Sequence, residues 1–222
     1  MNLFRLLRAD EIECRIGTIN AKGLSLLLYK DARCDMNVLD DTVGPMNWKK
    51  FYTRDNRNCT VEIFDKSKGQ WIGKEDTGTE SNTESEKGLA SDSFKRACVN
   101  WGIGRELYSA PFIWIGSDQC EIKADGTKYR CYDRFEVAKI GYDALERICS
   151  LTIEKVKGKT RTTVFTWANP TLTVTMVKTL AKVAEDHGYE EHDICNHFGV
   201  NKYRELTIEQ YMKLMDSMGE AG

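Results

Sequence analysis

Three short stretches of this 222-residue chain combine residue types that suit contact with a nucleic acid strand. The first follows Trp48 and mixes two further aromatic residues with four cations: Lys49, Lys50, Arg54 and Arg57. Cations neutralise phosphates and aromatic rings stack on splayed bases, so this mixture suits a single strand. The alternative is an ordinary solvated strand face, because composition alone does not separate the two.

The other two stretches are basic. One surrounds the turn of a predicted β-hairpin and contains Lys155, Lys157, Lys159 and Arg161. The other lies on a predicted helix and contains Lys87, Lys95 and Arg96. A merely solvated turn is the alternative for the hairpin cluster. One such cluster is common on protein surfaces, whereas three in one domain favour a DNA-binding surface.

Signals for catalysis are unspecific by comparison. The sequence has no G-x-x-x-x-G-K-[ST] loop, so no ATP site of that kind is expected. Three histidines at spacings of five do not share a helical face, which favours surface residues over metal ligands: His187, His192 and His197. Three carboxylates lie near a predicted β-hairpin, as nuclease acids often do: Asp65, Glu75 and Asp76. We expect no catalytic residue, no metal and no cofactor, with a metal-dependent nuclease as the alternative.

The end of the chain differs from the rest in charge and pattern. The formal net charge is −2, but residues 184–222 carry −6 and residues 1–183 carry +4. After Pro170, helices are predicted at 173–187, 190–198 and 207–218, and Thr207 with Gln210 matches a capping box. We therefore expect a main domain at residues 1–169, whose charge permits DNA binding, and a small three-helix module at residues 170–222.

Cysteine usage and hydropathy bear on the compartment. The 8 cysteines form no C-x-x-C pair and no zinc-ligand spacing, which predicts free thiols in a reducing cytoplasm. No apolar run approaches the roughly 18 residues that a membrane span needs. The first residues lack the pattern of a signal peptide. These features predict a cytoplasmic protein without a membrane segment.

One amphipathic helix at residues 83–101 organises the main domain. It begins with a capping-box pattern at Thr83 and Glu86, and Gly102 and Gly104 end it. At about 100° per residue, five side chains share a face suited to packing on a sheet: Ala90, Phe94, Ala97, Cys98 and Trp101. Lys95 flanks this face.

Strand signals surround that helix. We predict a hairpin or a kinked strand within residues 14–29, a short helix at 36–43, and strands at 46–53, 60–64, 70–73, 110–116, 128–137, 151–156 and 162–167. The fold class is α+β. It has an antiparallel β-sheet, in a β-β-β-α type of core, packed on the central helix and followed by the all-α module.

Two stretches match a known pattern in order and setting. YKDARCDMNVLDDTVGPMNW combines a tyrosine, a short helix and a Gly-x-x-x-Trp turn. EKGLASDSFKRACVNWGIG then combines an acidic residue, a Lys-Arg pair and a closing aromatic-Gly: Asp92, Lys95, Arg96, Trp101 and Gly102. Together they resemble the RAD fifty-two superfamily of single-strand annealing proteins, most of all its compact phage and prophage members. The resemblance covers residues 14–115.

The resemblance implies an ATP-independent protein that assembles into a ring or arc and anneals complementary strands in homologous recombination and phage DNA repair. Single-stranded DNA would lie in an outward-facing basic groove with its bases exposed. Lys95 and Arg96 match the family's groove-lining pair. Lys87 matches an earlier basic position, and Arg15 a basic residue at the start of the first strand. Val99 departs from the pattern, because the family often has another cation there.

The resemblance also implies partners. They are single-stranded DNA and further copies of the chain, in the cytoplasm of a bacterial host. The C-terminal module resembles the three-helix module of several phage annealing proteins and would contact a single-strand-binding protein or an exonuclease. A solubilising appendage is the alternative for this module. A nucleic-acid-binding module that does not anneal is the alternative for the whole chain.

Overall fold

The protein, seen in a computed structural model, is described over residues 3–79, 85–169 and 171–219, with the backbone alone for residues 85–87. Helices and antiparallel sheets both occur there, which confirms the predicted α+β class. The strands are β1 (Glu13–Asn20), β2 (Gly23–Tyr29), β3 (Trp48–Thr53), β4 (Asn58–Asp65), β5 (Gln70–Thr77), β6 (Ile113–Gly116), β7 (Ile122–Asp125), β8 (Lys128–Cys131), β9 (Arg134–Tyr142), β10 (Ile148–Lys157) and β11 (Thr160–Ala168). The α-helices are α1 (Ala32–Val43), α2 (Ser85–Trp101), α3 (Val174–Asp186), α4 (Glu191–Phe198) and α5 (Ile208–Gly219), and the 3-10 helices are η1 (Ala9–Glu11), η2 (Arg105–Ser109) and η3 (Tyr203–Glu205).

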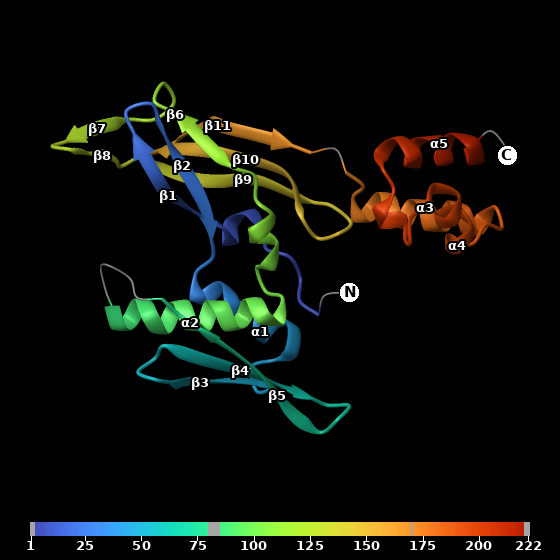
Figure 1. Cartoon of the computed structure of the whole chain (residues 1–222), viewed down its shortest axis with the longest axis horizontal. Coiled ribbons are helices and arrows are strands. Elements are labelled where there is room, and N and C mark those ends of the chain that lie inside the picture. Colours follow the sequence, from blue (N-terminus) through green and yellow to red (C-terminus); the bar gives the residue numbers. More distant parts are fainter. Residues whose placement is uncertain (1–2, 80–84, 170, 220–222) are drawn as a thin grey trace.

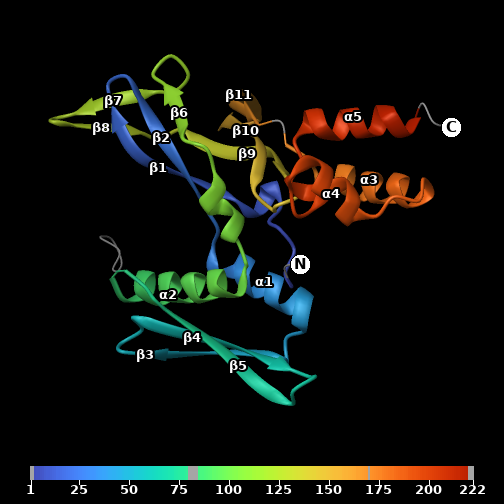
Figure 2. The same ribbon diagram turned by 45° about the vertical axis from the view of Figure 1, so that its right-hand side comes forward.

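Two sheets lie on opposite sides of α1 and α2 (Figures 1 and 2). The larger has the strand order β11-β10-β9-β1-β2-β6, and its edge strands β6 and β11 contact each other, so the sheet is curled. The smaller has the order β3-β4-β5 and is covered by α2. Where the sequence predicted one sheet, the described residues form these two and the two-stranded β7–β8 sheet. One continuous hydrophobic core joins the two larger sheets to α1 and α2.

Helix α2 follows its predicted pattern closely. Phe94, Ala97 and Cys98 are fully buried, as their shared face requires. At the C-terminal end, the N–H of Ile103 donates to the Cys98 carbonyl at 3.1 Å, and Gly102 has φ +106°. These are features of a glycine C-cap, so this end of the helix is confirmed. The predicted capping box at the other end lies outside the described side chains.

One predicted strand is divided. The segment 128–137 contributes to β8 and to β9, which pair with different partners. Between them the Asp133 carboxylate accepts the N–H of Glu121 at 2.7 Å, which bends the chain away from the β7–β8 hairpin. Period-2 alternation continues across such a bend, so the pattern alone did not reveal it.

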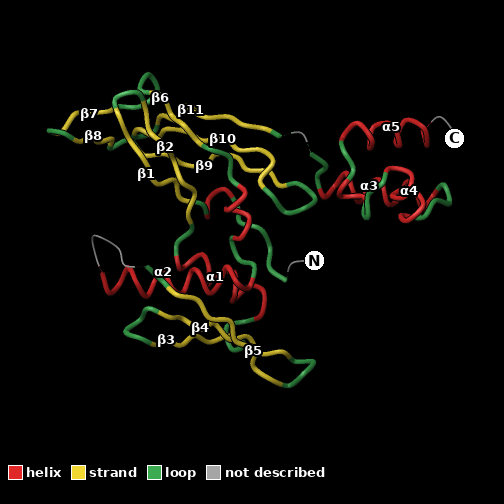
Figure 3. Tube along the Cα trace, in the orientation of Figure 1, coloured by secondary structure: helices red, strands yellow, loops and turns green. Residues whose placement is uncertain are grey.

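The C-terminal helices form a separate bundle, drawn in red at the end of the chain in Figure 3. The three predicted helices are confirmed as α3, α4 and α5. Thr207 and Gln210 exchange hydrogen bonds of 2.8 and 3.1 Å between side chain and backbone, as a capping box requires. In the described residues this bundle has its own hydrophobic cluster: Leu172, Leu180, Ala184, Ile194, Cys195, Tyr203, Leu206, Tyr211 and Met218.

A tryptophan ties α2 to the smaller sheet, which gives a test of this packing. The indole Nε1 of Trp101 donates to the carbonyl of buried Val61 at 2.9 Å. We expect Trp101→Phe to lower the free energy of unfolding by about 1–3 kcal/mol, because the buried acceptor loses its partner. Urea denaturation followed by circular dichroism measures the loss. Trp71→Phe, on the opposite face of that sheet, is the matched control, and an equal loss in both variants would contradict the interpretation.

Candidate nucleic-acid interface

A groove of about 700 Å³ lies between strand β2, helix α2 and the segment that connects α2 to β6. We call it the β2–α2 groove. Each wall comes from a different part of the chain, so the groove exists only in the folded protein and no local sequence motif encodes it. The residues that matter for its chemistry are Tyr29, Lys30, Thr79, Asp92, Lys95, Arg96, Val99, Tyr108 and Phe112.

Arg96 is fixed within this groove by a carboxylate. Its Nε donates to Asp92 at 3.0 Å, one helical turn away, and the backbone N–H of Thr79 donates to the same carboxylate oxygen at 2.9 Å. Burial opposes ionisation of Asp92, but the Thr79 N–H and the Arg96 guanidinium together hold the pKa of Asp92 below its usual range. The Arg96 side chain remains 42% exposed, so the guanidinium is oriented and still accessible to a ligand.

The environment of Lys95 lowers its pKa. The main cause is burial, to which the positive charges of Arg15 and Lys30 add, whereas Asp92 and Asp35 act in the opposite sense. Arg15 reaches this region from β1, where its guanidinium lies 4.8 Å from the centre of the Tyr29 ring. Of the residues predicted from sequence, Lys95 and Arg96 therefore line the groove, and Arg15, paired with Glu13 at 2.8 Å, lies over the ring of Tyr29, which also lines it.

Beneath the groove is a buried ion pair that the sequence prediction missed. Lys30 is 5% exposed and Asp35 is fully buried, and the Lys30 ammonium contacts one Asp35 carboxylate oxygen. The same ammonium lies 3.4 Å from the Lys95 carbonyl oxygen. Asp35 shares the helix face of Val38 and Leu39, and an acid among such apolar positions is the signal that would have revealed it.

The cluster after Trp48 is divided between the two faces of the smaller sheet. Lys49 lies 3.2 Å from Glu62 and 4.1 Å from the centre of the Trp71 ring, on the face away from α2. Lys50 points the other way, with its ammonium 4.2 Å from the centre of the Phe94 ring. Adjacent residues of a strand face opposite sides, so these two lysines do not form one patch. Two further members occupy the β3–β4 turn and are exposed: Arg54 and Arg57.

The hairpin cluster is partly neutralised within the protein. Arg161 lies 2.7 Å from Glu136, and the Lys155 ammonium donates to the Gln119 carbonyl at 2.8 Å. Lys157 and Lys159 flank the β10–β11 turn and are exposed. The side chain of Lys87, the remaining predicted cation, lies outside the described residues.

The carboxylates proposed for a nuclease do not come together. Asp65 accepts hydrogen bonds from Ser67 in the β4–β5 turn, and these hold its pKa below the usual range. Glu75 faces Thr60 five rungs further along the hairpin, about 17 Å away. In the residues that the structure describes, no group of three or more His, Cys, Asp or Glu side chains could hold a metal ion. Asp65 and Glu75 therefore do not share one site.

Comparison with protein-family models, with curated proteins and with solved structures found no match to this chain. Within the described ranges, none of the helices combines the length and apolar character that crossing a membrane requires. All eight cysteines are free thiols.

The buried pair leads to a stability prediction that depends on pH. Burial raises the pKa of Asp35 to about 6, although Lys30 partly offsets the effect. A carboxyl whose pKa is higher in the folded state penalises that state above this pKa, and the penalty fades as the pH falls through it. Lys30→Met leaves the carboxylate without its partner. We expect a loss of about 3–5 kcal/mol in the free energy of unfolding at pH 7, and a smaller loss at pH 5.

Urea denaturation at both pH values measures these losses. Lys22→Met is the matched control, because Lys22 lies exposed in the β1–β2 turn, and it should change stability by less than about 0.5 kcal/mol at either pH. Equal losses for Lys30→Met at pH 5 and pH 7 would show that Asp35 does not titrate as described.

Proposed function

We propose that this chain binds single-stranded DNA in the β2–α2 groove and anneals complementary strands without ATP. The observation that carries the proposal is that Lys95 and Arg96 line one groove together with exposed aromatic residues, one of which, Tyr29, lies under the Arg15 guanidinium. Cations beside aromatic rings suit single strands, whose phosphates need neutralisation and whose bases are free to stack. The resemblance of residues 14–115 to the annealing superfamily supports the same function.

In this proposal the protein makes and breaks no covalent bond. It neutralises phosphates, which lowers the repulsion between two strands, and it holds one strand extended while base pairing supplies the specificity. The anchored Arg96 guanidinium would orient toward phosphate with little further ordering, because Asp92 already fixes its Nε. Assembly into a ring or arc would place successive grooves side by side along one strand.

The acidic C-terminal bundle has a different proposed role. Residues 184–222 carry a charge of −6, which repels phosphate and makes this segment a poor DNA ligand. We propose that it contacts a protein partner, a single-strand-binding protein or an exonuclease, in the cytoplasm of a bacterial host.

Annealing of two complementary fluorescent oligonucleotides without ATP tests the central proposal. We expect the wild-type chain to accelerate pairing and Lys95→Ala/Arg96→Ala to lose the acceleration. Each phosphate contact contributes about 0.7 to the slope of log affinity against log salt for single strands, so the double variant should lower that slope by about 1.4. Lys178→Ala/Lys182→Ala is the matched control, because it removes two exposed cations from α3.

The possible results separate the alternatives. Strand binding by the wild type without faster pairing would assign the chain to the non-annealing binding modules. Magnesium-dependent cleavage that is lost in Glu75→Ala would assign it to the nucleases. An equal loss in the α3 control would show that binding depends on overall charge and that the groove has no special role.

A further inference from the structure

The two sides of the β2–α2 groove differ in chemistry. Helix α2 supplies Lys95 and Arg96, whereas the segment between α2 and β6 supplies two aromatic rings. Tyr108 is 75% exposed and Phe112 is 76% exposed, so both rings are accessible to a ligand. One side of the groove therefore carries cations that suit phosphates, and the lining from the segment between α2 and β6 is uncharged.

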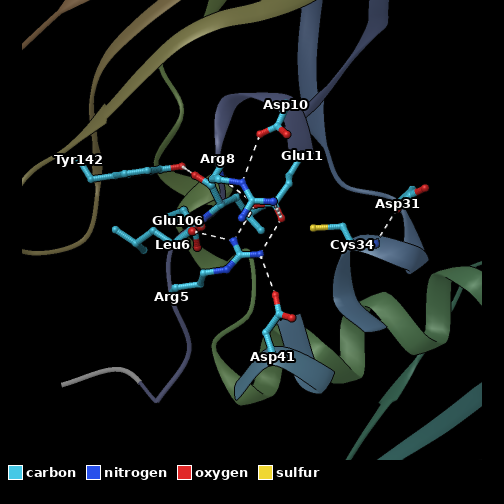
Figure 4. A network of polar contacts seen from close by, with 11 residues as sticks. Arg5, Leu6, Arg8, Asp10, Glu11, Asp31, Cys34, Asp41, Glu106 and Tyr142 are labelled. Carbon is cyan, nitrogen blue, oxygen red and sulfur yellow. Dashed lines mark hydrogen bonds and ion pairs between the residues drawn. The ribbon is translucent and has the colours of Figure 1, made fainter. Parts of the chain in front are cut away.

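These rings are exposed although their backbone is firmly held. Glu106, in the same 3-10 helix as Tyr108, accepts the N–H of Leu7 at 2.8 Å. The Ser109 hydroxyl donates to the Glu106 carbonyl at 2.6 Å and accepts the N–H of Ile148 at 2.8 Å. Figure 4 shows Glu106 beside the N-terminal segment that carries Arg5 and Arg8. These bonds hold the backbone around Tyr108, and the pairing of Ile113 with Leu26 holds the backbone beside Phe112, so a ligand that stacks on the rings meets a preformed surface.

The Phe112 ring also packs against a neighbouring aromatic ring. Phe112 stacks on Trp114 with ring centres 6.3 Å apart and planes 20° from parallel. Residues alternate between two faces along this segment. Ile113 and Ile115 are buried in the core, and Phe112 and Trp114 lie on the other face. The sequence suggested an apolar strand here, and this alternation was the signal for an exposed aromatic face.

We infer that Tyr108 and Phe112 stack on nucleobases while Lys95 and Arg96 hold the phosphates of the same strand. The inference rests on the proposed function and adds the part of the DNA that the groove recognises. In a duplex the base faces are already stacked, so the two rings give a preference for single strands. Stacking occupies the face of a base and leaves its pairing edge free, which is compatible with annealing.

A strand with no bases tests the inference directly. We would measure affinity for an oligothymidine and for an abasic strand with the same number of phosphates. Tyr108→Ala/Phe112→Ala should weaken binding to oligothymidine by roughly 5- to 150-fold for each ring that stacks. It should leave binding to the abasic strand and the salt dependence unchanged. Lys95→Ala/Arg96→Ala should weaken binding to both strands by the same factor.

Two further variants serve as controls. Tyr132→Ala removes a ring that is 76% exposed in the β8–β9 connection, outside the groove, and should not affect either strand. Tyr108→Phe/Phe112→Tyr keeps both rings and should retain the preference for oligothymidine. Circular dichroism shows whether each variant is folded.

The outcomes separate a failure of the stacking inference from a failure of the proposed function. The wild type could bind the oligothymidine and the abasic strand equally and lose both in Lys95→Ala/Arg96→Ala. That result would support the phosphate site and overturn base stacking. If the aromatic variant loses both strands equally, or changes the mass of the DNA-free assembly in light scattering, the rings support the fold or a contact between copies and the inference fails. If the wild type binds neither strand, the proposed function itself fails.

Discussion

A buried ion pair joins the segments that make the β2–α2 groove. Lys30 follows β2, its partner Asp35 belongs to α1, and the Lys30 ammonium also lies 3.4 Å from the Lys95 carbonyl in α2. Gly104 completes the arrangement, because a Cβ atom at this position would overlap the Lys30 side chain. A buried charge is costly unless its partner is in place, so the larger sheet, both helices and the segment after α2 have to assemble in one relative position. The geometry of the groove follows from that requirement.

Features that depend on residues close together in sequence could be predicted, and features that depend on residues far apart in sequence could not. The end of α2, the β1–β2 hairpin and the capping box at Thr207 depend on residues a few positions apart, and these features are present in the structure. The pairing of Glu13 with Glu136 joins strands more than a hundred residues apart, and no local pattern encodes it. The division of the strands into separate sheets therefore could not be predicted, and neither could the groove between the larger sheet and α2.

The candidate site shows the same limit. Lys95 and Arg96 were found from their neighbours on one helix, whereas the roles of the other cations depend on partners that are distant in sequence. Arg161 is paired with Glu136 and Lys49 with Glu62, so counting basic residues overstated the positive surface of the main domain. Tyr108 was missed because ring exposure is a property of the folded chain, whereas the alternation of Phe112 and Trp114 with two isoleucines could have revealed Phe112.

The order of the strands has a consequence for folding during synthesis. β1 lies between β2 and β9 in the larger sheet, but β9 begins at residue 134. One edge of the β1–β2 hairpin therefore stays unpaired until about two thirds of the chain has been made, and an open edge invites pairing with other chains. Exposed charges at Glu13 and Arg15 occupy that strand. Charged side chains on an open edge discourage such pairing, so the Glu13–Arg15 ion pair stands where an unpaired strand most needs one.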